Sequence, residues 1–502
     1  MTTLAQQRRP EDEKLPLGKL ATYGLQHVLT MYGGIIAVPL IIGNAAGLDP
    51  NGISVLIASC LFVGGLATIL QSVGLPFFGS QLPLVQGVSF AGVATMTAIL
   101  AGGEGIPGIL GSVIVASLMG LLIAPFFAMI VRFFPPVVTG TVITTIGLSL
   151  MPVAVGWVMG GNANAEDYGS LRNIGLAALT LGIVLILSRV GLAAISRLSI
   201  LLAIVIGTII AAIFGWADFS NVAARGYLAF PEPFAFGWPT VSVAAVISMF
   251  IVIIVTMTET TADIIAVGEI VGTKVDSKRI AAGLRADMIS SAVAPVFNSF
   301  TQSAFAQNVG LVAITGVKSR FVVTAGGVIL VILGLLPIVG GLVAAVPSPV
   351  LGGAGIVLFG TVAASGIRTL AKVEYEGNLN MIIVAVSIAF GLIPIINPDF
   401  YHAFPDWVGI ILHSGISSAA IMAVLLNLLF NHIGQKDKDR SDRSVFVAGT
   451  GRAIREEDLT RLLETDCILA EGDTIKNGKI IDASGHEVPV LTADENDSPN
   501  EK

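Results

Sequence analysis

Charged residues and cysteines are scarce in this chain of 502 residues. Asp, Glu, Lys and Arg make up 12% of it, whereas hydrophobic residues make up 54%. An ordinary soluble domain carries more charge than this. The two cysteines, Cys60 and Cys467, lie far apart in an apolar run and in a polar tail, which excludes a disulfide framework.

The chain also lacks an excess of basic residues. Its formal net charge is −7, and the segment from His432 to Lys502 holds sixteen acidic against ten basic residues. The remainder is therefore nearly neutral. Nothing in this balance supports a nucleic-acid partner, which needs a basic face.

Apolar runs of about 20 residues, long enough to cross a bilayer, recur from Leu20 to Phe430. The runs are continuous, which disfavours the alternating strands of a membrane barrel. The first 19 residues are polar and lack the apolar core and cleavage site of a signal peptide. The composition predicts an all-α polytopic membrane protein.

Fourteen membrane spans are expected along the chain. They lie near residues 20–43, 52–73, 82–101, 108–131, 136–158, 173–190, 197–215, 240–268, 280–298, 302–317, 319–338, 344–366, 378–397 and 406–431. We expect a cytoplasmic arm at 1–19, a transmembrane domain at 20–433 and an acidic cytoplasmic tail at 434–502. In the tail, the segment Asp458–Glu464 could form a short helix.

The basic residues segregate to one side of these spans. Lysine and arginine accumulate on the cytoplasmic side of short loops. Only Arg172 and Arg225 fall on the far side, whereas fifteen others fall on or near the first: Arg8, Arg9, Lys14, Lys19, Arg132, Arg189, Arg197, Lys274, Lys278, Arg279, Arg285, Lys318, Arg320, Arg368 and Lys372. This segregation favours an even number of spans in the cell membrane, with both termini in the cytosol.

The third and tenth spans are weak as ordinary helices. Residues 81–92 contain Gly, Pro and polar side chains, and residues 298–310 are polar and end in glycine. Because the two spans stand seven apart in order, they are equivalent in a protein of two inverted seven-span repeats. Broken helices at matching positions of such repeats indicate a transporter's site at the middle of the membrane. The alternative is that both segments dip into the membrane only for packing.

Polar side chains that could carry the chemistry follow in the second half. Gln307 and Asn308 place two amides side by side in an apolar setting, which is costly unless they bond something. Glu259 and Asp263 stand four residues apart, on one face of a helix. Like charges this close disfavour double ionisation, so the pair could exchange a proton. Alternatively, the helix ends early and both acids lie among the lipid headgroups.

Two further residues are open to two interpretations. Asp287 is either a proton or network carboxylate or an interfacial acid held by Arg285 or by helix ends. His27, in the first span, either moves protons or makes a packing hydrogen bond. Phe90, in the broken third span, offers an aromatic face. Together with the Glu259 carboxylate and the Gln307 amide, it would suit a flat, hydrogen-bonding heterocycle.

These residues resemble the signature of the nucleobase/ascorbate transporter family. The central match is Gln307-Asn308-Val309-Gly310, followed by Thr315-Gly316. The companions, similar in order and spacing, are Gln26-His27, Ser89-Phe90, Glu259 with Asp263, Asp287 and the run Pro347–Gly353. The resemblance covers about residues 20 to 430.

The resemblance implies two inverted seven-span repeats arranged as a core domain (spans 1–4 and 8–11) and a gate domain (spans 5–7 and 12–14), commonly paired as a homodimer. It implies that Glu259 and Gln307 bond the base, that Phe90 stacks on it, and that Ala306 and Phe90 offer main-chain N–H groups. His27, Asp263, Asp287 and Asn308 would form the proton-coupling network. Uracil carriers of the family have His where Asp263 stands, so a histidine relay is not carried over.

The function so implied is proton-coupled uptake of an oxidised purine, xanthine or uric acid, because Gln at position 307 accompanies such carriers in the family. Sodium is the weaker candidate for the driving ion. The alternatives are a uracil or other nucleobase symporter and an anion carrier like the sulfate permeases, although an anion site should present positive groups. No metal cluster, cofactor motif or nucleophile with a base points to an enzyme.

Overall fold

The computed structural model describes most of the chain up to residue 432 and short pieces of the tail. The described residues are 9–127, 134–190, 195–196, 198–217, 219, 228–373, 375, 379–401, 403–405, 408, 411–432, 454–455, 474–476, 479–481 and 490–491. The chain divides into two compact units, Met1–Ile433 and Gly434–Lys502. The predicted helix at Asp458–Glu464 lies outside the described residues.

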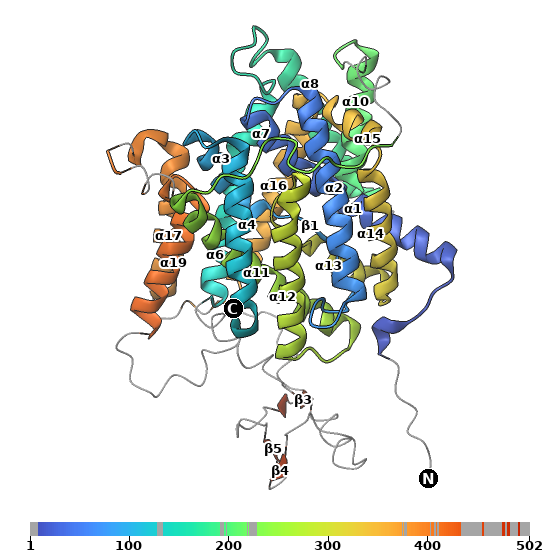
Figure 1. Cartoon of the computed structure of the whole chain (residues 1–502), viewed down its shortest axis with the longest axis vertical. Helices are drawn as coiled ribbons and strands as arrows, with labels where there is room; N and C mark the ends of the chain where they lie inside the picture. Colours follow the sequence, from blue (N-terminus) through green and yellow to red (C-terminus); the bar gives the residue numbers. More distant parts are fainter. Residues whose placement is uncertain are drawn as a thin grey trace, which may run out of the picture. The chain divides into compact units, whose positions relative to one another are not determined.

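The first unit is built from helices (Figure 1). They are α1 (Leu17–Ala45), α2 (Pro50–Val73), α3 (Val93–Ala101), α4 (Gly105–Ile123), α6 (Pro136–Ser149), α7 (Met151–Val158), α8 (Leu171–Arg189), α10 (Ser199–Ile213), α11 (Val243–Val271), α12 (Ser277–Val293), α13 (Ala306–Thr315), α14 (Arg320–Gly334), α15 (Pro337–Ala344), α16 (Ser348–Leu370), α17 (Leu379–Ile396) and α19 (Gly415–Asn427). Single turns connect them: η1 (Pro10–Asp12), η2 (Phe90–Gly92), η3 (Ala124–Phe126), η5 (Ala294–Phe297), η6 (Pro398–Tyr401) and the π-turn η7 (Leu428–His432).

Nine of the described helices are long and apolar enough to cross a bilayer, and the pair α14–α15, bent by 80°, makes ten if it counts as one span. The chain is thus a helical, multi-pass membrane protein. Local signals set several helix ends. The Asp49 side chain accepts a hydrogen bond from the Gly52 N–H at 2.8 Å where α2 begins, and Gly272, with φ of 78°, ends α11.

The helices fall into two packing groups. Helices α1, α2, α4, α11, α12, α14 and α15 pack mainly with one another, and α6, α7, α8, α10, α16, α17 and α19 do the same. Glycines allow close approach within each group. A Cβ on Gly65 of α2 would lie 2.6 Å from the Gly327 carbonyl of α14, and one on Gly147 of α6 would lie 2.3 Å from the Ala363 nitrogen of α16. We call these sets the first and the second helix group.

Two short strands lie between the helices of this unit. β1 (Gln86–Val88) pairs antiparallel with β2 (Gln302–Ala304), so that Gln86 lies opposite Ala304 and Val88 opposite Gln302. Each strand directly precedes a short helix, η2–α3 or α13. In a bilayer, backbone N–H and C=O groups that leave a helix must find other partners, and here the two broken segments partly satisfy each other.

One hydroxyl from the preceding helix fixes the first residue of each strand. Thr68 Oγ1 of α2 accepts from the Gln86 N–H at 2.9 Å and lies 3.1 Å from the Gln86 carbonyl. Ser291 Oγ of α12 accepts from the Gln302 N–H at 2.8 Å and lies 3.4 Å from the Gln302 carbonyl. We call these two hydroxyls the strand clamps.

The N-terminal arm lies against one face of the first helix group. Arg279 donates to Glu11 at 2.6 Å, and Arg320 donates to Asp12 at 2.7 Å. Glu11 is fully buried. Arg279 also bonds the carbonyls of Ser80 and Gln81, at 2.6 and 2.9 Å. The arm therefore ties together loops far apart in sequence, and basic residues predicted to share one side do meet there.

The tail contains two small strand pairs among its described residues. β3 (Ile454–Arg455) pairs parallel with β6 (Val490–Leu491), and β4 (Thr474–Lys476) pairs antiparallel with β5 (Lys479–Ile481). These pieces belong to the second unit and contain no spanning helix.

Candidate functional site

The two predicted carboxylates lie well inside α11. The helix runs from Val243 to Val271, so it continues beyond Asp263, and the alternative of an early helix end is wrong. Glu259 and Asp263 are half-buried, whereas the neighbouring side chains Thr258, Thr260 and Thr261 are buried. Among the described residues, neither carboxylate makes a hydrogen bond or ion pair. Both carboxylates can therefore accept hydrogen bonds from N–H donors of a ligand.

The start of α13 presents Ala306 and Gln307, both exposed. No side chain caps this helix, and the Asn308 N–H donates to the Phe305 carbonyl at 2.9 Å, so the N–H groups of Ala306 and Gln307 are left available to a ligand. Phe305, the preceding residue, is buried, and its ring packs between two glycines. A Cβ on either Gly34 or Gly87 would lie 2.7 Å from that ring. The Gln307 amide makes no hydrogen bond within the described part of the chain.

Asn308 joins α13 to α1 through His27. Its amide nitrogen lies 3.0 Å from the His27 carbonyl and 3.1 Å from His27 Nδ1. A carbonyl can only accept, so the amide nitrogen is the donor and Nδ1 is an acceptor, which places the ring proton on Nε2. Both side chains are buried. His27 therefore has the packing hydrogen bond that the sequence left as one alternative.

Phe90 begins η2 and is half-buried. Ser89 fixes the turn, since its N–H donates to the Thr301 carbonyl at 2.9 Å and its hydroxyl accepts from the Ala91 N–H at 3.2 Å. The Phe90 ring contacts Phe359 of α16 edge to face, with ring centroids 6.0 Å apart. Phe90 thus touches the second helix group.

Asp287 is buried in α12, and its partner is not the one that the sequence suggested. Arg285 donates instead to the Phe77 carbonyl at 2.8 Å. Thr260 Oγ1 of α11 donates to Asp287 Oδ2 at 2.6 Å. The interpretation of Asp287 as an acid held by Arg285 is therefore wrong.

Helix α11 brings most of these parts together. It packs against η2, β2, α12 and α13, the elements that carry or adjoin Phe90, Asp287 and Gln307. The residues with predicted substrate roles are exposed (Ala306, Gln307) or half-buried (Phe90, Glu259). The residues His27, Asp287 and Asn308 are buried. Within the described part of the chain, no direct hydrogen bond joins Glu259 to Gln307.

Sequence reasoning missed the hydroxyls that organise this region. Thr68, Thr260 and Ser291 each bond a segment outside their own helix. Ser and Thr are common in apolar spans, where most bond their own backbone. Each of these three hydroxyls bonds a strand of the two paired broken segments. The sequence does not display this pairing, so it does not distinguish them from the other hydroxyls.

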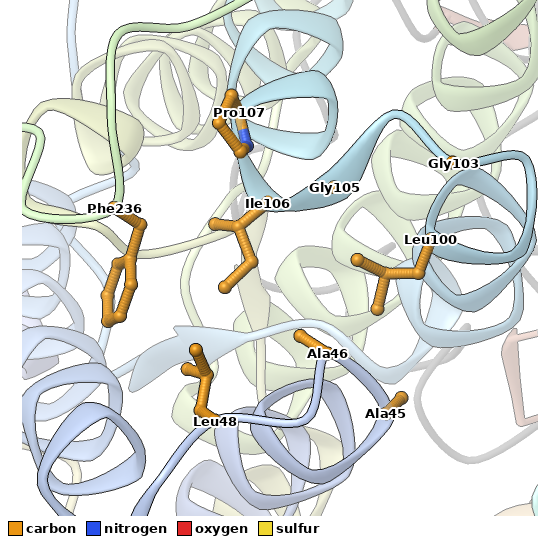
Figure 2. Close-up of a pocket in the computed structure, with 9 residues that line it drawn as sticks. All are labelled: Ala45, Ala46, Leu48, Leu100, Gly103, Gly105, Ile106, Pro107 and Phe236. Carbon is orange, nitrogen blue, oxygen red and sulfur yellow. The ribbon is translucent and has the colours of Figure 1, made fainter.

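A pocket of about 360 Å³ lies elsewhere, and none of the predicted site residues lines it. It is an open pocket between the ends of α1 and α3, the start of α4 and the Phe236 ring (Figure 2). Its lining is apolar: Ala45, Ala46, Leu48, Leu100, Gly103, Gly105, Ile106, Pro107 and Phe236. Among the described residues, no three His, Cys, Asp or Glu side chains are grouped to hold a metal ion.

Comparison with known proteins gives one sequence family and one shared fold. A family profile described as "Permease family" matches residues 18–400. The uric acid transporter UacT of Escherichia coli is 40% identical over 85% of this chain and 89% of its own length. The xanthine permease of Bacillus subtilis is 39% identical over 84% of this chain and 96% of its own length. The transmembrane domain of the cyanobacterial bicarbonate transporter BicA, only 17% identical, has a similar fold, with a TM-score of 0.56 over 82% of this chain and all of that one.

Proposed function

The chain belongs to this permease family, the nucleobase/ascorbate transporters, and from that premise we propose that it takes up xanthine or uric acid across the cell membrane, driven by protons. Two relatives near 40% identity bear the names of uric acid and xanthine carriers. The site must then hold a flat purine whose edges carry both N–H donors and carbonyl acceptors.

The observation that carries the proposal is a set of unengaged polar groups on touching elements. Glu259 on α11 has a carboxylate that can accept ring N–H groups, and Gln307 on α13 has an amide that can pair with a carbonyl or N–H edge. The main-chain N–H groups at Ala306 and Phe90 add donors, and the Phe90 ring supplies a stacking face. A purine satisfies all of these groups at once.

We propose fourteen spans in two inverted repeats of seven. The ten long candidates and the four shorter apolar helices, Phe90–Ala101, Ser199–Ile213, Ala306–Thr315 and Gly415–Asn431, add up to that number. The strand clamps support the repeat, because Thr68 in the helix before β1 and Ser291 in the helix before β2 make equivalent bonds. Short broken helices at matching places are typical of transporters built this way.

The core and gate domains correspond in this proposal to the two helix groups. The core includes the first group with α3 and α13, and the gate is the second group, all within residues 20–433. Contacts between them include the Phe90–Phe359 ring pair and the hydroxyls of Thr95 and Ser414, 2.8 Å apart. Movement of one group against the other would expose the site alternately to the two sides of the bilayer.

Coupling would run through the carboxylates Asp263 and Asp287, with His27 and Asn308 holding α13 in place. Both termini would face the cytosol, since Arg279 and Arg320 meet the N-terminal arm at one face. The acidic tail, 434–502, would be cytoplasmic. A homodimer is the proposed assembly.

Uptake into proteoliposomes tests the proposal. We expect saturable accumulation of labelled xanthine or uric acid when the lumen is made alkaline, loss of accumulation with a protonophore, and no dependence on sodium. Excess bicarbonate or sulfate should not compete, because neither has a flat ring to stack on Phe90 or ring N–H donors for the Glu259 carboxylate. No saturable uptake of either base, with the protein present in the membrane, would refute the proposal.

A further inference from the structure

Four threonines stand close together in the middle of α11, and one of them bonds differently from the rest. The hydroxyls of Thr256, Thr258 and Thr261 each donate to a carbonyl of their own helix four residues earlier, at 2.8, 2.9 and 2.7 Å. Thr260 Oγ1 instead reaches Asp287 Oδ2 of α12 at 2.6 Å and the Ala304 nitrogen of β2 at 3.3 Å. Thr260 is completely buried.

The chemistry of a hydroxyl fixes the direction of both bonds. It has one hydrogen and two lone pairs. A backbone N–H can only donate, so Thr260 accepts from Ala304 and gives its hydrogen to the Asp287 carboxylate. A hydrogen bond to an ionised carboxylate is about twice as strong as one between neutral groups. A proton added to Asp287 therefore weakens this bond and frees the hydroxyl to turn, which disturbs its contact with Ala304.

Ala304 is well placed to pass such a change to the substrate. It is the last residue of β2, opposite Gln86, and two residues later Ala306 begins α13 with Gln307 next to it. The other end of β2 is held by the Ser291 clamp. Thr260 itself follows Glu259 directly in α11. The Thr260 hydroxyl thus links the buried Asp287 carboxylate to β2, which leads to Gln307, and Thr260 is also the sequence neighbour of Glu259.

Few charges surround Asp287 apart from those on α11. Helix α12 packs mainly against α2, α4, α11, β2, η3 and η5, and of these only α11 carries Asp, Glu, Lys, Arg or His. Asp263, three residues after Thr260, is one of the acids of α11. Glu259 is on the same face of α11, and α2 adds the Cys60 thiol, bonded to Ser299 at 3.5 Å. On α12 itself, Arg285 is bonded to the Phe77 carbonyl.

Asp287 has a second oxygen, Oδ1, which is buried and has no hydrogen-bond partner among the described residues. This oxygen is where a transported proton would add, because Oδ2 is already occupied by Thr260. We propose that Thr260 is a positioning residue that transmits the protonation of Asp287 to the substrate-binding start of α13 through the Ala304 N–H. The inference rests on the proposed proton-coupled transport of a purine.

Thr260→Val removes the hydroxyl and keeps the shape of the side chain. We expect accumulation of labelled uric acid driven by a pH gradient to fall by about ten- to hundredfold, the loss expected on removal of one hydrogen bond to a charged group. Exchange of labelled for unlabelled base across a membrane without a gradient should keep its KM. Thr260→Ser, which restores the hydroxyl, should recover accumulation. Thr258→Val is the matched control, since it loses only a bond within its own helix, and it should behave as the wild type.

A double-mutant cycle separates coupling from folding. If Thr260 acts through Asp287, Thr260→Val should cause no further loss of coupling in an Asp287→Asn background. Equal accumulation by Thr260→Val and Thr258→Val, or additive losses in the cycle, would overturn the inference. A wild type that accumulates neither base would remove the proposed function and this inference together, whereas failure of the inference alone shows only among the variants.

Discussion

The two broken segments, β1–η2–α3 and β2–α13, start alike and are then anchored to different parts of the molecule. Each strand is held at its first residue by one hydroxyl clamp, Thr68 or Ser291. Beyond the strands, Thr95 of α3 bonds Ser414 next to α19 in the second helix group. Asn308 of α13 bonds His27 of α1, within the first group.

The two segments also differ in how exposed their candidate substrate-binding residues are. Phe90 is half-buried and contacts Phe359, whereas Ala306 and Gln307 at the start of α13 are exposed. The first segment is therefore the one that can sense movement between the helix groups, and the second is the one that can present polar groups to a solute. Five substitutions test whether the two segments have these different roles.

Glu259→Ala should have the largest effect. The base would lose its charged acceptor beside the exposed start of α13, a loss of about 2–5 kcal/mol. Uptake of labelled xanthine and uric acid should fall to the level of membranes without the protein. Glu269→Ala changes an exposed acid on the same helix and should leave uptake intact. An unchanged rate in Glu259→Ala would remove α11 from the substrate site.

Gln307→Glu should change selectivity and leave the protein stable. A neutral amide that both donates and accepts becomes a charged acceptor, so edges that need a donor are rejected. We expect unlabelled xanthine and uric acid to compete about tenfold less well, and other bases such as uracil to gain, on the scale of one mispaired polar contact. Competition by a panel of bases measures this. An unaltered order of preference would assign specificity to some other side chain.

Loss of a strand clamp should lower stability. Ser291→Ala and Thr68→Val each leave a buried strand N–H without its acceptor, at a cost of about 1–3 kcal/mol. Thermal unfolding in detergent should show similar losses for both, because their bonds are equivalent. Thr141→Val removes a buried hydroxyl that bonds only the Val137 carbonyl of its own helix, and it should cost little. A loss of thermal stability in only one of the two variants would show that the two segments are not held equivalently.

Thr95→Val should have the smallest effect. It removes the bond between α3 and Ser414, worth about 0.5–1.5 kcal/mol, from a contact between the helix groups. The maximal rate of uptake should change by about two- to tenfold, with little change in KM, because the substrate contacts remain. Thr97→Val, whose hydroxyl bonds only α3 itself, provides the control. Equal rates in the two variants would show that the bond between α3 and the second helix group has no effect on transport.

Much of this molecule was predictable from its sequence because long apolar runs and helix caps are local signals. Hydropathy predicted the membrane-spanning helices. The Gly, Pro and polar content of residues 81–92 and 298–310 predicted the two irregular segments. The family follows from the Gln307–Gly310 signature and its companions, and the profile match over residues 18–400 confirms it. The roles of Phe90, Glu259, Gln307 and Asp287 in transport stay predictions.

What the sequence could not predict depends on contacts between distant segments. Gln86 and Ala304 pair across more than two hundred residues, and neither segment reads as a strand. Thr258, Thr260 and Thr261 look alike in sequence, and only their surroundings decide that Thr260 alone bonds Asp287. The same holds for Arg285, whose neighbour in sequence is not its partner in space.

The docking of the N-terminal arm has a consequence for how the protein is made. Glu11 and Asp12 are synthesised before their partners Arg279 and Arg320, which follow more than 260 and 300 residues later in the chain. The two ion pairs can form only after α12 and α14 have been synthesised. The docking of the arm is thus a late step of biogenesis.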